Sequence, residues 1–366
     1  MIAIRELQID DLPSVARLWD VVEHDGTGRT HAKRLVEFLR QTLFESPWVD
    51  PELPSLVASE GSEIVGFLGS NVRRMRFEGR PLRMACSAHL LAHPRVRAQA
   101  VGARLLHTYL DGPQELTITD GANELVRKMW EGLGGTTVHA SCLSFIQPLR
   151  PGQLAIHRLG RSRRLKPLGL ALRPAATLLD RFPAQFVSQP DGRSDTGATS
   201  ERLTPASLLE QLPSVTAGIR VVPDYDSGYL TWLFEALDDS ARREPLWPER
   251  VERGGLWAEL VRTSSGVAGW YVCQLHKGGF CRVLQFAAPE RKAAVVLDRL
   301  RRGALEMGAA GIYGRLEPRL VGPLSEQRTL LQLSPGRLLV TARDDAVVDA
   351  IVRGDALLTR MDGEWW

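Results

Sequence analysis

The junction between residues 82–92 and residues 98–110 constrains the fold of this chain more than any other feature. Residues 82–92 are mainly apolar and predict a strand. Residues 98–110 carry apolar side chains at helical spacing and predict a helix. Pro94 lies between the two patterns. The chain therefore passes directly from a buried strand into a helix.

The start of this helix has the features of an anion site. Its unpaired amide groups and the helix dipole both favour negative charge. Small side chains allow a diphosphate to approach the backbone, and Arg97 adds a positive charge. We expect the turn to bind a diphosphate through Arg97, Ala98, Gln99, Ala100, Val101, Gly102 and Ala103.

The rest of the first 150 residues also alternates between strand and helix patterns. The predicted elements are a strand (2–8), a helix from Leu12, a helix (33–44), strands (53–59, 64–71, 74–77 and 82–92), a helix (98–110), a strand (115–119), a helix (126–133) and a strand (136–147). This order predicts an α/β fold with a mixed sheet (an α+β arrangement).

These residues resemble the GNAT superfamily of N-acetyltransferases. The fingerprint of that family is a basic residue or Gln, two variable residues, Gly, one variable residue, and Gly or Ala. Arg97, Ala100 and Gly102 occupy it here. Residues 123–134 resemble the second signature of the family, and residues 4–19 resemble its first strand and helix. The resemblance covers residues 1–150 in the family's order.

The resemblance implies a sheet in which two central strands splay apart, with acetyl-CoA bound as co-substrate in the splay. The backbone of Leu90, Leu91 and Ala92 would then bond the pantetheine amides, and Asn123 would join the cofactor-binding residues. The implied reaction is the transfer of an acetyl group from acetyl-CoA to an amine of a small-molecule or peptide acceptor.

Three positions depart from the family pattern. Ala100 replaces the first glycine of the fingerprint, and we expect it to present a helical amide with tighter clearance. Trp130 replaces a frequent Tyr, the usual acid, and Cys86 stands where a Glu base is frequent. We take His89 and Cys86 as the candidate catalytic residues. In a regular strand they lie on opposite faces, so only one can face the cleft.

The second half repeats the strand and helix order of the first without its glycine fingerprint. The predicted elements are a hairpin (255–261 and 267–275), a strand (280–287), a helix opened by Pro289, a strand (311–316), a helix near 324–331 and a strand (337–342). We expect tandem GNAT-like acyl-CoA N-acyltransferase domains: residues 1–150 bind acetyl-CoA, and residues 220–366 form a degenerate copy.

Residues 151–219 predict a basic, partly flexible linker between the two domains. Residues 158–173 hold six basic side chains and no acidic one, and residues 188–200 are polar and glycine-containing. The basic stretch favours a solvated face, with weak contact to an acidic partner or an anionic membrane surface as alternatives.

Composition narrows the class of protein further. A net charge of +3 does not favour nucleic-acid binding. The four cysteines show no zinc-ligand spacing and predict reduced thiols and no metal site. Without a signal-peptide pattern or a long apolar run, we expect a cytoplasmic protein with no transmembrane segment. Two alternatives to the acetyltransferase stay open: a non-catalytic CoA-binding or scaffolding protein, and a Fem-type or polysaccharide-related acyl or aminoacyl transferase.

Overall fold

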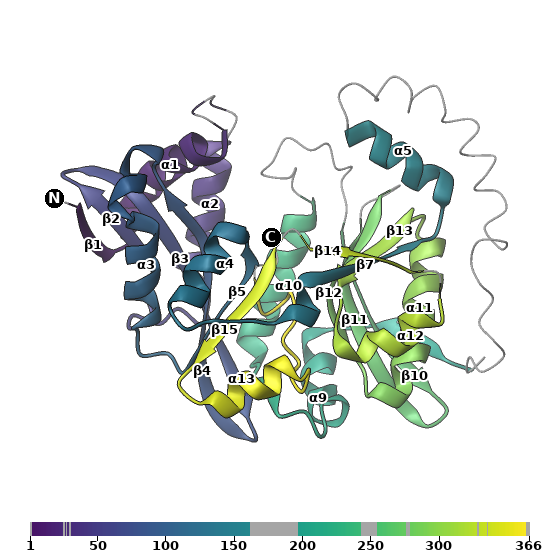
Figure 1. The fold of residues 1–366 in the computed structure, drawn as a ribbon. Helices are drawn as coiled ribbons and strands as arrows, with labels where there is room; N and C mark the ends of the chain where they lie inside the picture. The colour runs from purple at the N-terminus through teal and green to yellow at the C-terminus, as the bar shows by residue number, and fades with distance from the viewer. Residues whose placement is uncertain are drawn as a thin grey trace.

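The protein contains two mixed β-sheets with helices packed on their faces (Figure 1). This architecture confirms the predicted mixed α/β class. The computed structural model describes residues 2–24, 26, 28, 31–161, 197–242, 255–275, 279–327, 329–334 and 336–363.

The first sheet consists mainly of strands from the N-terminal half. In order across the sheet these are β1 (Ile2–Glu6), β2 (Leu56–Glu60), β3 (Glu63–Phe77), β4 (Arg80–Ala92), β5 (Leu116–Ala122), β15 (Arg337–Ala342) and β6 (Thr136–Thr137), with β9 (Val221–Pro223) paired to β3. Only β4 and β5 pair in parallel; every other pair in this sheet is antiparallel. A parallel pair needs a crossover, which α3 provides.

Helices cover both faces of the first sheet. They are α1 (Leu12–His24), α2 (Ala32–Leu43), α3 (Val101–Leu110), α4 (Glu124–Gly132) and α13 (Asp345–Val352). Buried residues of α1 and α2 form one core with Val57 and Phe67, whereas α3 packs into another core with Ala58 and Leu68. Val57 and Ala58 are neighbours on β2, so the two cores lie on opposite faces of the sheet.

The second sheet has the same arrangement of a parallel central pair joined by a helix. Its order is β14 (Leu330–Leu333), β7 (Leu143–Pro148), β13 (Gly311–Arg315), β12 (Phe280–Ala287), β11 (Gly266–Leu275), β10 (Gly255–Thr263) and β8 (Thr199–Arg202). The parallel pair is β12 and β13, and α11 (Glu290–Glu306) connects them. Other helices of this half are α5 (Pro151–Arg161), α9 (Pro205–Val215), α10 (Ser227–Arg242) and α12 (Val321–Ser325).

Each half of the chain places a strand inside the sheet of the other half. β7, from the N-terminal half, lies between β13 and β14, with Ile146 opposite both Tyr313 and Leu330. β15, from the C-terminal half, lies between β5 and β6, with Val340 opposite Ile118 and Thr136. Each sheet is therefore complete only when both halves of the chain are present.

In the second sheet the C-terminal segment contacts both central strands where they part. β12 and β13 pair through Arg282 and Tyr313 and then separate. Beyond that point the amide of Met361 donates to the carbonyl of Leu284 on β12 at 3.2 Å. The guanidinium of Arg315 on β13 donates to the carbonyl of Leu358. Residues 357–362 therefore bridge the gap between these strands.

Two predicted elements of the chain were wrong. The predicted strand 136–147 divides into β6, a short 3₁₀ turn (His139–Cys142) and β7, and its two strands belong to different sheets. The predicted helix near 324–331 is wrong at its end, because Leu330–Leu333 form β14 against β7. A short leucine-rich run fits either structure, and the long-range pairing decides between them.

Part of the basic stretch 158–173 and most of the predicted linker 188–200 belong to residues 162–196, outside the residues that the structure describes. None of the described helices combines the length and the apolar character needed to cross a bilayer.

Candidate functional site

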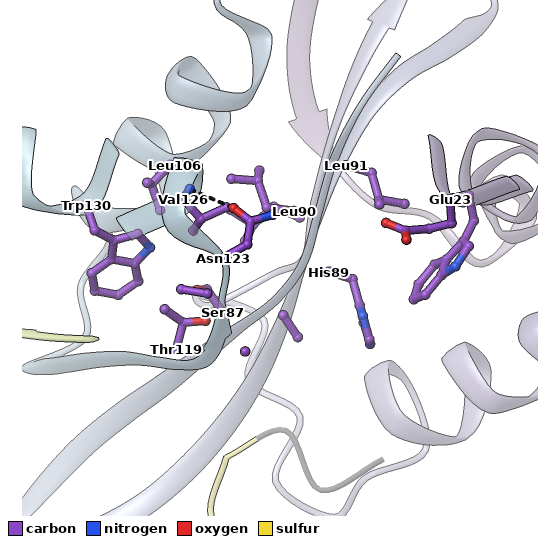
Figure 2. A pocket seen from close by; sticks show the side chains of 15 residues that line it. Glu23, Ser87, His89, Leu90, Leu91, Leu106, Thr119, Asn123, Val126 and Trp130 are labelled. Carbon is purple, nitrogen blue, oxygen red and sulfur yellow. Dashed lines mark hydrogen bonds between the residues drawn. The ribbon is translucent and has the colours of Figure 1, made fainter. Parts of the chain in front are cut away.

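The candidate site opens where β4 and β5 separate. The two strands pair only from Met84–Leu116 to Cys86–Ile118 and diverge beyond these residues. A cavity of about 210 Å³ lies in the gap (Figure 2). Its walls include residues 87–91 of β4, residues 119 and 121–123 of β5 and the following turn, Trp19 and Glu23 of α1, and Val126 and Trp130 of α4.

A β-bulge in β4 shapes the wall of this cavity. Phe67 pairs with Leu91 but Gly69 pairs with Ala88, so two residues of β4 stand opposite Leu68 alone. His89 adopts the left-handed region at φ 56°, which a non-glycine residue rarely does. A bulge of this kind re-aims the side chains that follow it. It thereby breaks the simple alternation of faces along β4.

The helix that should bind a diphosphate starts later than predicted. Pro94–Gln99 form a 3₁₀ helix, and α3 begins at Val101 rather than at Ala98. Ala100 is the N-cap residue at φ 52° and ψ 36°, in the left-handed region. The expected helical amide at Ala100 is therefore wrong. The backbone takes the conformation that a glycine would adopt at little cost, and alanine holds it at a cost of about 1–2 kcal/mol.

The start of α3 is open to solvent. Arg97, Ala98, Gln99 and Ala100 are exposed. No side chain caps the helix, and the first amides of a helix have no acceptor within it. A Cβ added at Gly102 would meet only the Cβ of Ala92, at 3.9 Å. None of the described residues therefore requires a glycine at this position.

The remaining predicted cofactor residues lie along the same gap. Leu90 and Leu91 line the cavity, and Ala92 ends β4 beside Gly102. Asn123 also lines the cavity and caps α4, since its Oδ1 accepts from the amide of Val126 at 3.0 Å. The structure thus brings Leu90, Ala92 and the α3 turn to the face of the first sheet that α3 covers, whereas Leu91 packs in the core with α1 on the other face.

The two candidate catalytic residues are separated. His89 lines the cavity, with its ring centroid 4.6 Å from that of Trp19 and 6.4 Å from that of Phe38. Burial lowers the pKa of His89 to about 3, so at neutral pH its imidazole is uncharged and a weak base. Cys86 is fully buried in a core with Met84 and is not among the cavity-lining residues.

Four polar or aromatic cavity residues were not predicted from the sequence: Trp19, Glu23, Ser87 and Thr119. Glu23 is the one formally charged side chain among the described residues that line the cavity, and its carboxylate points toward the gap (Figure 2). Nothing in the sequence pointed to Glu23 as a site residue, because an acidic side chain at the end of an amphipathic helix is normally exposed to solvent.

Comparison with known proteins identifies the fold. No family model matches the sequence, and no curated protein matches it. Solved structures match along most of the chain. A GCN5-related N-acetyltransferase from Anabaena variabilis ATCC 29413 has a TM-score of 0.55 and 10% identity, covering 94% of this chain and 74% of that one.

Two further structures are similar to the same extent. A GCN5-related N-acetyltransferase from Kribbella flavida has a TM-score of 0.52 and 14% identity, covering 94% of this chain and 72% of that one. A conserved protein of unknown function from Enterococcus faecalis V583, described as a probable N-acyltransferase, has a TM-score of 0.53 and 8% identity, covering 93% and 73%. At these identities the likeness shows the fold.

Proposed function

We propose that this chain, which has the fold of the GCN5-related N-acetyltransferases, transfers an acetyl group from acetyl-CoA to the amine of an acceptor. The fold supports a general acyltransferase activity. The choice of acetyl-CoA as donor rests on the geometry of the gap between β4 and β5.

The separation of β4 and β5 beside an open helix start is the observation that carries the proposal. The gap holds a cavity of about 210 Å³, and the start of α3 follows the end of its β4 wall. An extended pantetheine arm fits a narrow gap between strands, where Leu90 and Leu91 offer backbone groups. The diphosphate would meet the first amides of α3, where Gly102 leaves open space.

The opposite end of the cavity suits an amine. Trp19 and Glu23 of α1 form this end, and the carboxylate of Glu23 attracts a positively charged amine. The ammonium first gives one proton to water, and the free amine then attacks the thioester carbonyl carbon. A C–N bond forms, the C–S bond breaks, its electron pair stays on sulfur, and the amine proton passes to Glu23 or to water. We assign removal of this proton to Glu23 or water rather than to His89, because the low pKa of His89 makes it a poor base.

A titration of acetyl-CoA into the wild-type protein and a Gly102→Glu variant tests the binding site. The added carboxylate would occupy the open space at the start of α3 and repel the diphosphate. We expect saturable binding to the wild-type protein and none to the variant, measured by isothermal titration calorimetry.

Thr108→Glu provides the matched control for this titration. Thr108 is exposed and lies on the same helix, away from its N-terminus, so the variant adds the same charge outside the site. It should bind like the wild-type protein. Equal affinity of Gly102→Glu and the wild-type protein would remove the proposed diphosphate site.

A second measurement separates an enzyme from a CoA-binding protein. Release of free CoA from acetyl-CoA is followed with a panel of primary amines and polyamines. We expect amine-dependent release that falls in a Glu23→Gln variant. Tight binding of acetyl-CoA without amine-dependent release would contradict the transferase and leave a protein that only binds CoA.

A further inference from the structure

Trp130 is a fully buried residue on α4 with an unused hydrogen-bond donor. Its relative exposure is 0%, and none of the described residues accepts a hydrogen bond from its Nε1. An indole nitrogen can only donate. A buried donor without an acceptor is costly and rare in folded proteins, and it often marks a functional position.

The unused donor faces the gap between β4 and β5. Trp130 belongs to the residues that line the cavity, and Figure 2 shows its nitrogen on the side of the ring that faces Ser87 and Asn123. Ser87 follows Cys86, the last residue of β4 that pairs with β5. The nitrogen therefore points to the region where the two strands begin to part.

Packing on the side of the indole away from the cavity fixes its orientation. A Cβ at Gly135 would lie 2.9 Å from Cε3 of Trp130, so the glycine leaves room for the six-membered ring. The amide of Gly135 donates to the carbonyl of Trp130 at 2.8 Å, which fixes the end of α4. Leu105 and Leu106 of α3 and Ala85 of β4 belong to the same core as the ring. The ring cannot turn its nitrogen away without disturbing this packing.

We propose that the Nε1–H of Trp130 donates a hydrogen bond to the sulfur of the thioester bound in the gap and stabilises the departing thiolate. This inference rests on the proposed function and adds one catalytic residue, which contacts the reacting sulfur. Trp130 transfers no proton. When the C–S bond breaks, the electron pair stays on sulfur, and the thiolate remains hydrogen-bonded to the indole until CoA is released. A thiol with a pKa near that of cysteine leaves readily as its anion, so no acid is required.

The test measures the ionisation of the CoA thiol when CoA is bound. A hydrogen bond to the thiolate favours the charged form and lowers the thiol pKa. We expect the pKa of bound CoA in the wild-type protein to be lower by about 1 than in Trp130→Phe, a tenfold difference in the thiolate-to-thiol ratio. The ultraviolet absorbance of the thiolate reports it. The protein's own four cysteines are buried and are subtracted with the ligand-free protein.

Trp270→Phe is the matched control. Trp270 is equally buried, but its Nε1 donates to Oε1 of Gln285 at 2.8 Å in the second sheet, outside the cavity. This variant should lose stability and leave the thiol pKa of bound CoA unchanged. A thiol pKa that is equal in the wild-type protein and Trp130→Phe overturns the inference, while binding of CoA itself preserves the proposed function.

A second readout does not depend on CoA binding by the variant. The indole N–H resonance of Trp130 is identified by its absence from the nitrogen-15 spectrum of Trp130→Phe. Adding CoA to the wild-type protein above the thiol pKa should move this resonance downfield. Binding of CoA that leaves the resonance in place overturns the inference, and a wild-type protein that binds no CoA by calorimetry overturns the proposed function.

Discussion

Two small residues at the start of α3 have different reasons for being small. Ala100 adopts the left-handed conformation that reverses the chain before the helix, which strains any residue with a Cβ. Gly102 is an ordinary residue of the first helical turn, and a Cβ there would meet only Ala92. The glycine thus gives up helix stability with no packing reason among the described residues, which agrees with the proposed diphosphate site.

Replacing Gly102 with alanine should separate stability from binding. Alanine reduces the freedom of the unfolded chain and fits the space, so the free energy of unfolding should rise by about 0.5–1 kcal/mol. The fingerprint admits alanine at this position, so the variant should still bind acetyl-CoA, in contrast to Gly102→Glu. Urea unfolding and calorimetric titration measure the two quantities. A stabilised variant that binds no acetyl-CoA would contradict this expectation.

At the scale of residues, the sequence predicts where a diphosphate site should lie but not the local geometry there. The small residues after Pro94 are the basis of that prediction. The left-handed conformation of Ala100 was not predictable, because alanine rarely adopts it. The unused donor of Trp130 was also not predictable, because a tryptophan in the apolar stripe of a helix is usually a core residue.

At the scale of elements, the bulge in β4 controls what faces the cavity. A regular strand would place Cys86 and His89 on opposite faces, but the extra residue opposite Leu68 changes the direction of the strand. His89 takes the strained conformation, and its ring packs against Trp19. A bulge depends on pairing with the neighbouring strand, so no pattern within residues 82–92 could reveal it.

The buried imidazole of His89 should make stability depend on pH. The folded pKa of about 3 lies below the ordinary value of 6.5, so the unfolded chain takes up the proton first as the pH falls. Stability from this group is therefore complete above pH 6.5 and is lost between pH 6.5 and 3. The slope should reach up to about 1.4 kcal/mol per pH unit.

A His89→Asn variant isolates this effect. Asparagine tolerates the left-handed conformation and does not titrate. Its free energy of unfolding should be lower near pH 7, because the ring contacts are lost, but it should fall less steeply than that of the wild-type protein between pH 6.5 and 4. Parallel slopes in urea unfolding across this range would show that His89 is not buried as described.

The second sheet parts its central strands like the first, and the C-terminal segment lies between them. Thr359 and Met361 of the C-terminal segment hydrogen-bond to Gln285 and Leu284 of β12, and both are buried. Leu358 accepts from Arg315 of β13. We propose that the second half is a degenerate copy in which the chain itself occupies the position of the pantetheine arm.

At the scale of the whole molecule, the exchange of β7 and β15 ties the two halves together. A division at residue 150, as predicted from the sequence, would leave β7 without β13 and would leave β5 without β15. The local patterns of both strands were visible, and Arg337–Ala342 was predicted as a strand. Their partners are far away in sequence, and amphipathic spacing carries no information on which sheet accepts a strand.

This exchange predicts a single cooperative unfolding transition. Neither sheet can lose its central region without releasing a strand of the other half, so the two halves should unfold together. Calorimetry and circular dichroism in the near and far ultraviolet should give one midpoint, with equal calorimetric and van't Hoff enthalpies. Two separated transitions would show that the halves are independent domains.

A crystal structure of the protein with CoA would locate the ligand, on which the proposed function and the role of Trp130 both depend. We expect the pantetheine arm between β4 and β5, its diphosphate on the amides of Val101, Gly102 and Ala103, and its sulfur beside Nε1 of Trp130. Density for CoA at any other place on the molecule, with the gap between β4 and β5 still empty, would contradict this expectation.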